Sequence, residues 1–225
     1  MAEQKHTHDP LDVEEALSTS EAFLIKNKNT FLTVVIALVA IIGGYIGYKN
    51  LISEPREEKA SAAIAKGERY FIADNFETAL NGDSLGYKGF VKLADELSGT
   101  DAANLANAYA GICYAQLGKH KEAIKYLEEF SGDDKLVAPA ILGTIGNCYA
   151  QLNELDKAAA TLIKAADKAN SIALSPIYLI QAGEIYEKLG KNAEAIEAYK
   201  AVKSEYANSY QAMDIDKYIQ RASIK

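Results

Sequence analysis

Two stretches of this 225-residue chain repeat nearly the same sequence 35 positions apart. Residues 110–130 read AGICYAQLGKHKEAIKYLEEF, and residues 145–165 read IGNCYAQLNELDKAAATLIKA. A third copy follows 37 residues later. The copies share a glycine, a tyrosine, a leucine, an alanine and a large residue: Gly111, Tyr114, Leu117, Ala123 and Leu127; Gly146, Tyr149, Leu152, Ala158 and Leu162; Gly183, Tyr186, Leu189, Ala195 and Tyr199. A period of this length indicates a chain built from stacked structural repeats.

Each copy has two apolar helical faces separated by a polar break, which reads LGKHKE, LNELDK or LGKNAE. Gly118 and Gly190 suit the left-handed backbone conformation that ends a helix, and Asn153 is the next most suitable residue. Pro139 and Pro176 stand near the start of a first helix, where proline is tolerated because the first-turn amides have no intrahelical partner. Each repeat is therefore predicted to be a helix–turn–helix pair.

The recurring glycines and alanines remove side chains where the two helices of a pair would cross, and the recurring tyrosines fill the space beside them. One such pair cannot bury its apolar face alone, whereas stacked pairs bury a continuous core. The chain is also rich in alanine, leucine, lysine and glutamate, which are strong helix formers. We therefore predict an all-α fold organised as a right-handed α-solenoid.

The pattern Gly-x-x-Tyr followed by Ala-x-x-x-large resembles the tetratricopeptide repeat (TPR) family, with three clear copies over about residues 104–203. The bulky residue that the family places early in the first helix is replaced by Asn107, Leu142 and Leu179, and the family's late proline is missing. The resemblance implies a protein-binding module.

A degenerate copy is predicted before these three. Gly67, Tyr70 and Ala79 keep the repeat spacing, and then NGDSLGY (81–87) interrupts it. Phe90 precedes the next repeat glycine by 21 residues, as Leu162 does. YKGFVKLADEL is therefore predicted to be a second helix with an insertion of about seven residues near its start.

The last 20 residues, YANSYQAMDIDKYIQRASIK, are predicted to form a C-terminal capping helix. Met213, Tyr218 and Ile219 are expected to cover the last apolar face and leave the charged residues outside. The predicted repeat domain spans 60–225.

An uncharged apolar run, NTFLTVVIALVAIIGGYIGY, occupies residues 29–48. At about 1.5 Å per residue it spans the roughly 30 Å hydrocarbon core of a bilayer. A buried soluble helix would have a polar face, which 34–42 lacks, and a cleaved signal peptide would have a shorter leading segment and a small-x-small cleavage site. We predict an uncleaved signal anchor, with an N-terminal tail at 1–28, a transmembrane helix at 29–49 and a linker at 50–59.

Basic residues flank the run on both sides: Lys26 and Lys28 precede it, and Lys49, Arg56 and Lys59 follow it. The positive-inside rule therefore favours neither orientation. In the tail, residues 12–25 have the pattern of a short amphipathic helix.

The sequence offers little for catalysis. His6 and His8 are interpreted as part of a solvated tail rather than a metal site, and His120 falls in a turn between helices. The sequence has no P-loop, GxSxG, HExxH or CxxC motif. A net charge of −7 argues against general affinity for nucleic acid. We predict a non-enzymatic protein with no catalytic residue, cofactor, metal site, nucleic-acid partner or small-molecule substrate.

The two cysteines, Cys113 and Cys148, occupy the same position in neighbouring repeats. Equivalent positions on stacked helices lie about 9–10 Å apart, whereas a disulfide needs Cα atoms within about 7 Å. We predict two buried free thiols.

The TPR resemblance also implies a groove lined by the first helices of the repeats, on residues beside the Gly-x-x-Tyr core. Carried over by position, the candidate protein-binding residues are Asn104, Ala108, Ile112 and Ala115; Gly143, Asn147, Ala150 and Gln151; Ile180, Glu184, Glu187 and Lys188. TPR proteins that bind acidic chain ends place Lys and Arg in this groove. The corresponding positions here are not basic, so we do not expect a cytosolic chaperone-tail adaptor.

An anchor followed by such repeats resembles the bacterial inner-membrane family of the ancillary SecYEG translocon subunit (YfgM-like). This resemblance implies a periplasmic repeat domain, partners among the Sec translocon, a periplasmic chaperone and exported polypeptides, and a role as a scaffold or chaperone-type accessory of export. The alternatives are a structural subunit of another envelope complex, in outer-membrane assembly, division or motility, and a receptor that faces the cytosol.

Overall fold

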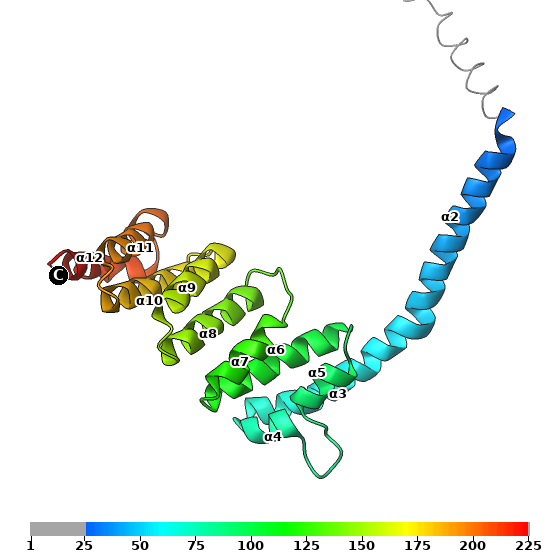
Figure 1. The fold of residues 1–225 in the computed structure, drawn as a ribbon, viewed down its shortest axis with the longest axis horizontal. Helices are drawn as coiled ribbons and strands as arrows, with labels where there is room; N and C mark the ends of the chain where they lie inside the picture. The colour runs from blue at the N-terminus through cyan, green and yellow to red at the C-terminus, as the bar shows by residue number, and fades with distance from the viewer. Residues whose placement is uncertain (1–25, 225) are drawn as a thin grey trace, which may run out of the picture. The chain divides into compact units, whose positions relative to one another are not determined.

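In the computed structural model of the chain, residues 26–224 are described (Figure 1). The predicted amphipathic helix at 12–25 and the two tail histidines lie outside this range. The described residues form helices and turns, without a strand, which confirms the all-α prediction. The helices are α2 (Lys28–Tyr48), the π-helical turn η1 (Lys49–Ser53), α3 (Glu54–Ile72), α4 (Phe76–Asn81), α5 (Phe90–Glu96), α6 (Asp101–Gln116), α7 (His120–Glu128), α8 (Val137–Gln151), α9 (Leu155–Ala169), α10 (Ser175–Lys188), α11 (Asn192–Glu205), the 3-10 helix η2 (Tyr210–Asp214) and α12 (Ile215–Ile224).

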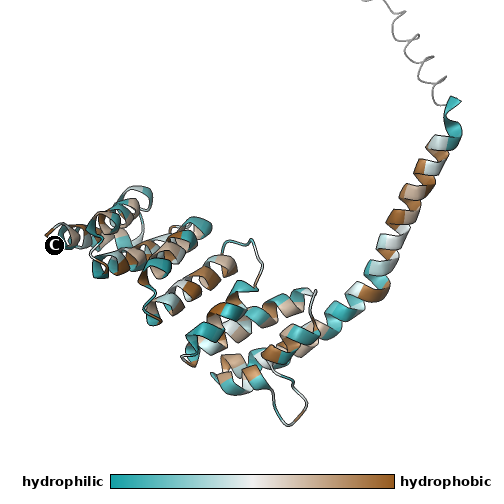
Figure 2. Ribbon diagram, viewed as in Figure 1, coloured by the Kyte–Doolittle hydropathy of each residue, from teal (hydrophilic) through white to brown (hydrophobic). Residues whose placement is uncertain are grey.

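The chain divides at Pro55 into two compact units. In the first unit, α2 is mostly brown to white in the hydropathy colouring (Figure 2), and none of its residues is buried in the protein. Among the described residues, the helix that contains α2 is the one long and apolar enough to cross a membrane.

The segment predicted as a linker, 50–59, is helical. Residues Lys28 to Ile72 form one unbroken helical stretch that includes the π-helical turn η1. In this turn the Glu54 N–H donates to the Lys49 carbonyl, five residues earlier. A widened turn directly before Pro55 accommodates a residue that has no N–H to donate. Proline therefore marks a change of helix type here and not the end of the helix.

In the second unit the predicted helix pairs are present as α6–α7, α8–α9 and α10–α11, with α3 and α4–α5 as the first, degenerate pair. Each pair crosses at its glycine. A Cβ built on Gly146 would lie 2.8 Å from Cγ of Leu162, and Gly111 faces Leu127 in the same way. Because only a hydrogen fits at these crossings, the glycines determine how closely the two helices of each pair approach.

The first pair confirms the predicted insertion. A Cβ on Gly67 would lie 2.6 Å from Cζ of Phe90, so Phe90 fills the place that Leu127 fills in the next repeat. The loop between α4 and α5 is ordered by Asp83, which accepts hydrogen bonds from the Leu85 N–H (2.8 Å), the Tyr87 N–H (2.9 Å) and the Tyr70 hydroxyl (2.6 Å).

The turns between paired helices also follow the prediction. Gly118, Asn153 and Gly190 have φ angles of 73°, 59° and 72°. Asp74, at φ 55°, holds the same place in the first pair. Aspartate tolerates the left-handed region better than most residues, although it is not a usual signal for a helix end.

The C-terminal cap is confirmed in part. Tyr218 and Ile219 pack on the last core cluster, beside Tyr199 and Ile215. Met213 does not cover the apolar face as predicted, because it lies in η2 with 70% of its surface exposed. The 3-10 helix η2 leads directly into α12, and the last core cluster is instead covered by Ile215 and Ala222 of α12, which are both buried.

Cys113 and Cys148 are both buried free thiols, as predicted. Burial raises the pKa of the Cys113 thiol to about 12 and also raises the pKa of Cys148. Both side chains therefore act as small neutral residues of the core at physiological pH.

Candidate functional site

The predicted groove residues lie on the first helices α6, α8 and α10, but several of them face the next repeat. Ala108, Ile112 and Ala115 belong to the cluster that packs against Ile141 and Ile145 of α8. The positions beside the Gly-x-x-Tyr core thus contribute to the contact between consecutive repeats.

Gly143 is buried for a related reason. A Cβ at this position would lie 2.5 Å from Cε1 of Tyr178, so the glycine admits the Tyr178 ring of α10 onto α8. Ala108 is also buried, with 5% of its surface exposed. Neither residue is accessible to a partner from the surface.

Two further predicted residues hold the domain together. The Asn104 side chain donates to the Ser131 carbonyl (2.6 Å) and accepts from the Ser131 N–H (2.7 Å), and so fixes the segment that follows α7. The Glu187 side chain, 5% exposed, accepts from the Tyr199 hydroxyl (2.8 Å) and from two nitrogens of Arg221 (2.6 and 3.0 Å). Glu187 therefore ties the capping helix α12 to the last repeat.

The other predicted residues retain some access to solvent. Ala150 and Ile180 are half-buried, while the side chains of four residues are exposed along α8 and α10: Asn147, Gln151, Glu184 and Lys188.

A second surface, which sequence reasoning missed, lies beside α7. The 35-residue offset to α9 predicts that α7 should run to about residue 134, yet α7 ends at Glu128. The sequence there is EFSGDD, which has low helix propensity after Phe130. Asn104 holds Ser131 away from a helical path, and Asp134 accepts from the N–H groups of Leu136 (2.8 Å) and Val137 (2.6 Å) at the start of α8.

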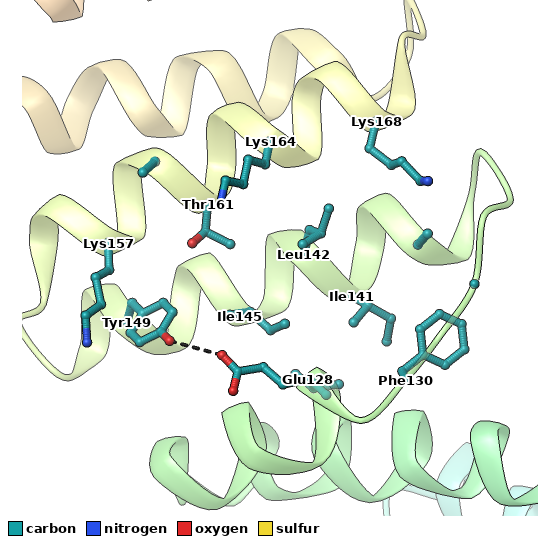
Figure 3. Close-up of a pocket in the computed structure, with 14 residues that line it drawn as sticks. Glu128, Phe130, Ile141, Leu142, Ile145, Tyr149, Lys157, Thr161, Lys164 and Lys168 are labelled. Atoms are coloured by element: carbon teal, nitrogen blue, oxygen red, sulfur yellow. Dashed lines mark hydrogen bonds between the residues drawn. The ribbon is translucent and has the colours of Figure 1, made fainter. Parts of the chain in front are cut away.

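The early end of α7 leaves a cleft of about 580 Å³ between the end of α7, α8 and α9 (Figure 3). We call this the α7–α9 cleft. Its apolar floor includes Leu127, Ile141, Leu142 and Ile145. Its α9 side carries three lysines: Lys157, Lys164 and Lys168.

The ionic groups of the cleft are fixed by a few contacts. The Tyr149 hydroxyl donates to Glu128 (3.2 Å), and burial together with this carboxylate raises the pKa of Tyr149. Lys157 pairs with Glu154 at 2.6 Å, which raises the pKa of Lys157, and its Nζ lies 5.2 Å from the centre of the Tyr149 ring. Lys168 pairs with Asp133 and lowers the pKa of that carboxyl.

The cleft suits binding better than chemistry. Its volume falls in the range of about 300–1,000 Å³ typical of ligand sites, but it is open and offers no nucleophile paired with a base. No group of three or more potential metal ligands occurs among the described residues. The sequence signal that could have revealed the cleft is the replacement of a helical stretch by EFSGDD, opposite lysines spaced seven and four residues apart on one helix.

Comparison with known proteins agrees with this architecture. Tetratricopeptide repeat profiles match residues 104–130, 139–167 and 178–209. The crystal structure of the MamA protein resembles this chain with a TM-score of 0.50 at 18% identity, over 73% of this chain and 90% of MamA. No curated protein matches the sequence. At this identity the likeness to MamA shows the fold alone.

The second unit is therefore an α-solenoid of tetratricopeptide repeats. Such repeats are protein–protein interaction modules, and the fold is typically a non-enzymatic scaffold.

Proposed function

We propose that this chain is a non-enzymatic interaction protein of the bacterial inner membrane, which assists protein export as a scaffold or chaperone-type accessory. In this proposal α2 anchors the chain in the membrane, and the repeat domain lies in the periplasm. Its partners are the Sec translocon, a periplasmic chaperone or exported polypeptides.

The observation that carries this proposal is the combination of an apolar helix with an interaction domain in one chain. No residue of α2 is buried in the protein, and its apolar side chains surround the helix. In water this surface would be costly, at about 25 cal/mol per Å² of apolar area, whereas a bilayer would cover it. This layout resembles that of the YfgM-like family, and the resemblance supports a site of action at the export machinery.

The repeat domain supports the binding part of the proposal. Asn147, Gln151, Glu184 and Lys188 are exposed along consecutive first helices, and the α7–α9 cleft lies on the second-helix side. Export accessories must hold a partner or an unfolded client without modifying it. Two separate surfaces without catalytic groups are consistent with that task.

Topology is the first test. Bacteria that produce the full chain with a C-terminal epitope are converted to spheroplasts and treated with protease, and the epitope is followed by immunoblot. The proposal expects loss of the epitope in intact spheroplasts, with a cytoplasmic protein protected as control. Protection of the epitope would place the repeats in the cytoplasm and refute the export role.

Crosslinking then tests the partner. A photo-reactive amino acid is placed at Gln151 or at Lys164, and at exposed Lys59 near the start of α3 as the matched control. Adducts with translocon subunits or with nascent exported chains at Gln151 or Lys164, but not at Lys59, are expected. One stoichiometric envelope protein in place of these adducts would instead support a structural subunit of another envelope complex.

A further inference from the structure

The lysines of the α7–α9 cleft are not a general property of the repeat. The repeat offsets of 35 and 37 residues give each lysine an equivalent position in the preceding repeat, on α7 or in the segment that follows α7, and another in α11 of the next repeat. The three equivalent sets are Glu122, Glu129 and Asp133; Lys157, Lys164 and Lys168; and Glu194, Ala201 and Glu205. Of these three repeats, only the one that contains α9 has a basic row, in a chain of net charge −7.

The reversed row borders an apolar floor. Of the charged residues that line the cleft, three are lysines and one is Glu128. Lys164 is exposed and has no ion pair within the part of the chain that the structure describes. Lys168 pairs with Asp133, whose side chain is 96% exposed, and such surface pairs are weak because solvent screens them. Two of the three ammonium groups are therefore open to a competing carboxylate at little cost.

The next hollow along the domain carries the opposite charge. Between α9, α10 and α11 a cleft of about 300 Å³ is lined by Leu179 and Tyr186, and by four acidic residues: Asp167, Glu194, Glu197 and Glu205. An acidic segment would be repelled there and attracted to the α7–α9 cleft. Because the two clefts carry opposite charge, an acidic segment should bind at the α7–α9 cleft and not at the cleft between α9, α10 and α11. Repulsion from a wrong site is a common basis of specificity.

The shape favours a polypeptide segment over a lipid surface. The floor residues Ile141 and Ile145 are buried, with 4% and 6% of their surfaces exposed, so a flat bilayer could not reach them. Lys157 and Lys168 are 11 residues apart on α9, which is about 16 Å of helix. A segment of three helical turns covers this length.

We propose that the α7–α9 cleft binds an acidic amphipathic segment of a partner protein, whose apolar side chains contact the floor while its carboxylates pair with Lys157, Lys164 and Lys168. This inference rests on the proposed role as an interaction module and adds the chemistry of its ligand. It assigns binding to the second-helix side of the repeats, in addition to the first-helix groove.

The test uses the full chain in nanodiscs of zwitterionic lipid and three fluorescent 16-residue helical peptides. The peptides share leucines at positions i, i+4, i+7 and i+11 and differ only in carrying glutamate, glutamine or lysine beside them. Fluorescence anisotropy should show that the glutamate peptide binds at least roughly fivefold more tightly than the glutamine peptide, and that the lysine peptide binds most weakly. Added salt should reduce this preference, because exposed charge pairs are screened. Equal binding of all three peptides, or binding of none, would overturn the proposal.

Variants locate the binding. Lys164→Glu should weaken the glutamate peptide roughly fivefold or more, and Leu142→Gln should weaken the glutamate and glutamine peptides alike. The matched control is Lys200→Glu, which makes the same charge change at an exposed position of α11 outside the cleft. Unchanged far-UV circular dichroism verifies folding. Equal losses for Lys164→Glu and Lys200→Glu would show a nonspecific charge effect and refute the cleft as the site.

Two other occupants give distinct results. Competition by anionic phosphatidylglycerol in the nanodisc, at the same Lys164-dependent site, would assign the cleft to lipid and overturn the proposal. A self-association of the full chain that Lys164→Glu abolishes would assign the cleft to a second copy and also overturn the proposal.

The peptide assay is independent of export. Charge-selective peptide binding without translocon adducts in cells refutes only the proposed function. Adducts that persist in Lys164→Glu, combined with no peptide selectivity, refute only this inference.

Discussion

Replacing Gly183 with alanine should destabilise the last repeat, although alanine is the better helix former. A Cβ at this position would lie 2.6 Å from Cζ and 3.0 Å from Cδ1 of Tyr199, and Tyr199 is fully buried. Carbon atoms pack at about 3.5–4.0 Å, so the ring must move by several tenths of an ångström or more. The ring hydroxyl also donates to Glu187 at 2.8 Å, which limits that movement.

The magnitude follows from opposing contributions. Overpacking of a buried site costs about 1–3 kcal/mol, and this overlap belongs at the upper end. The higher helix propensity of alanine stabilises the folded chain by about 1 kcal/mol relative to glycine. The net loss in the free energy of unfolding should be about 2 kcal/mol. It should approach 4 kcal/mol if the displaced ring also loses its hydrogen bond to Glu187, since bonds to charged groups contribute about 1.5–3 kcal/mol.

The assay is urea unfolding of the full chain in detergent, followed by far-UV circular dichroism and by tyrosine fluorescence, because the chain has 14 tyrosines and no tryptophan. Gly146→Ala is the graded comparison. Its Cβ would meet Leu162 at 2.8 and 3.1 Å, so a loss of about 1 kcal/mol or less is expected. Ala65→Gly, at an exposed position of α3, measures the propensity contribution alone at about 1 kcal/mol.

A double mutant tests the mechanism. Tyr199→Leu installs the residue found at the equivalent positions of the two preceding repeats, and removes the ring that clashes. Combined with Gly183→Ala, it should cost at least about 1 kcal/mol less than the sum of the single losses. If Gly183→Ala stabilises the chain, or if the two changes are additive, the close crossing does not determine the packing of this repeat.

Three further predictions follow from other contacts. Arg221→Ala should lower the free energy of unfolding by about 1–3 kcal/mol, because the buried Glu187 carboxylate loses its cationic partner and keeps the Tyr199 hydroxyl as a donor. Arg221→Lys should recover part of this loss, and an equal loss in the two variants would contradict the charge argument. Stability should be constant from neutral pH to about pH 8 and fall above it, because burial raises the pKa values of Cys113 and Tyr109 to about 12 and the unfolded chain therefore releases these protons first. Urea titrations at alkaline pH should show a shallower fall for Cys113→Ala, and an unchanged slope would refute this account. Asp83→Ala removes three hydrogen bonds that order the loop between α4 and α5, so proteolytic cleavage at 84–86 should become faster. Cleavage is measured by mass spectrometry, with Asp95→Ala at an exposed position as the control. Equal rates in the two variants would show that Asp83 does not order the loop.

Much of the fold could be predicted from local signals. The glycines at 118 and 190 and Asn153 take the left-handed conformation that their side chains favour, and these turns divide the helices where the sequence breaks. The insertion in the first repeat was also predictable, because Phe90 keeps its distance to the next repeat glycine while the residues before it do not. Such signals depend on residues close in the chain or on a strict period.

The candidate site was less predictable, because it depends on which face of a helix meets its neighbour. Gly143 has the position of a groove residue but receives the Tyr178 ring of the next repeat. Glu187 has the appearance of an exposed acid, yet Arg221 reaches it from 34 residues away. Neither contact could be predicted from the local sequence, because each partner residue lies on another helix.

The sequence by itself determined the period, the helix pairs, the two thiols at equivalent positions and the uncharged run of α2. These follow from helical spacing, turn chemistry and length, which act over a few residues. Only the tertiary structure decided that α7 ends at Glu128 and that the gap becomes a cleft. That outcome requires Asn104 to capture Ser131 across 27 residues, while the lysine row of α9 comes to border a floor made by α8. Low helix propensity after Phe130 allows α7 to end early, but contacts between distant segments turned the resulting gap into a cleft.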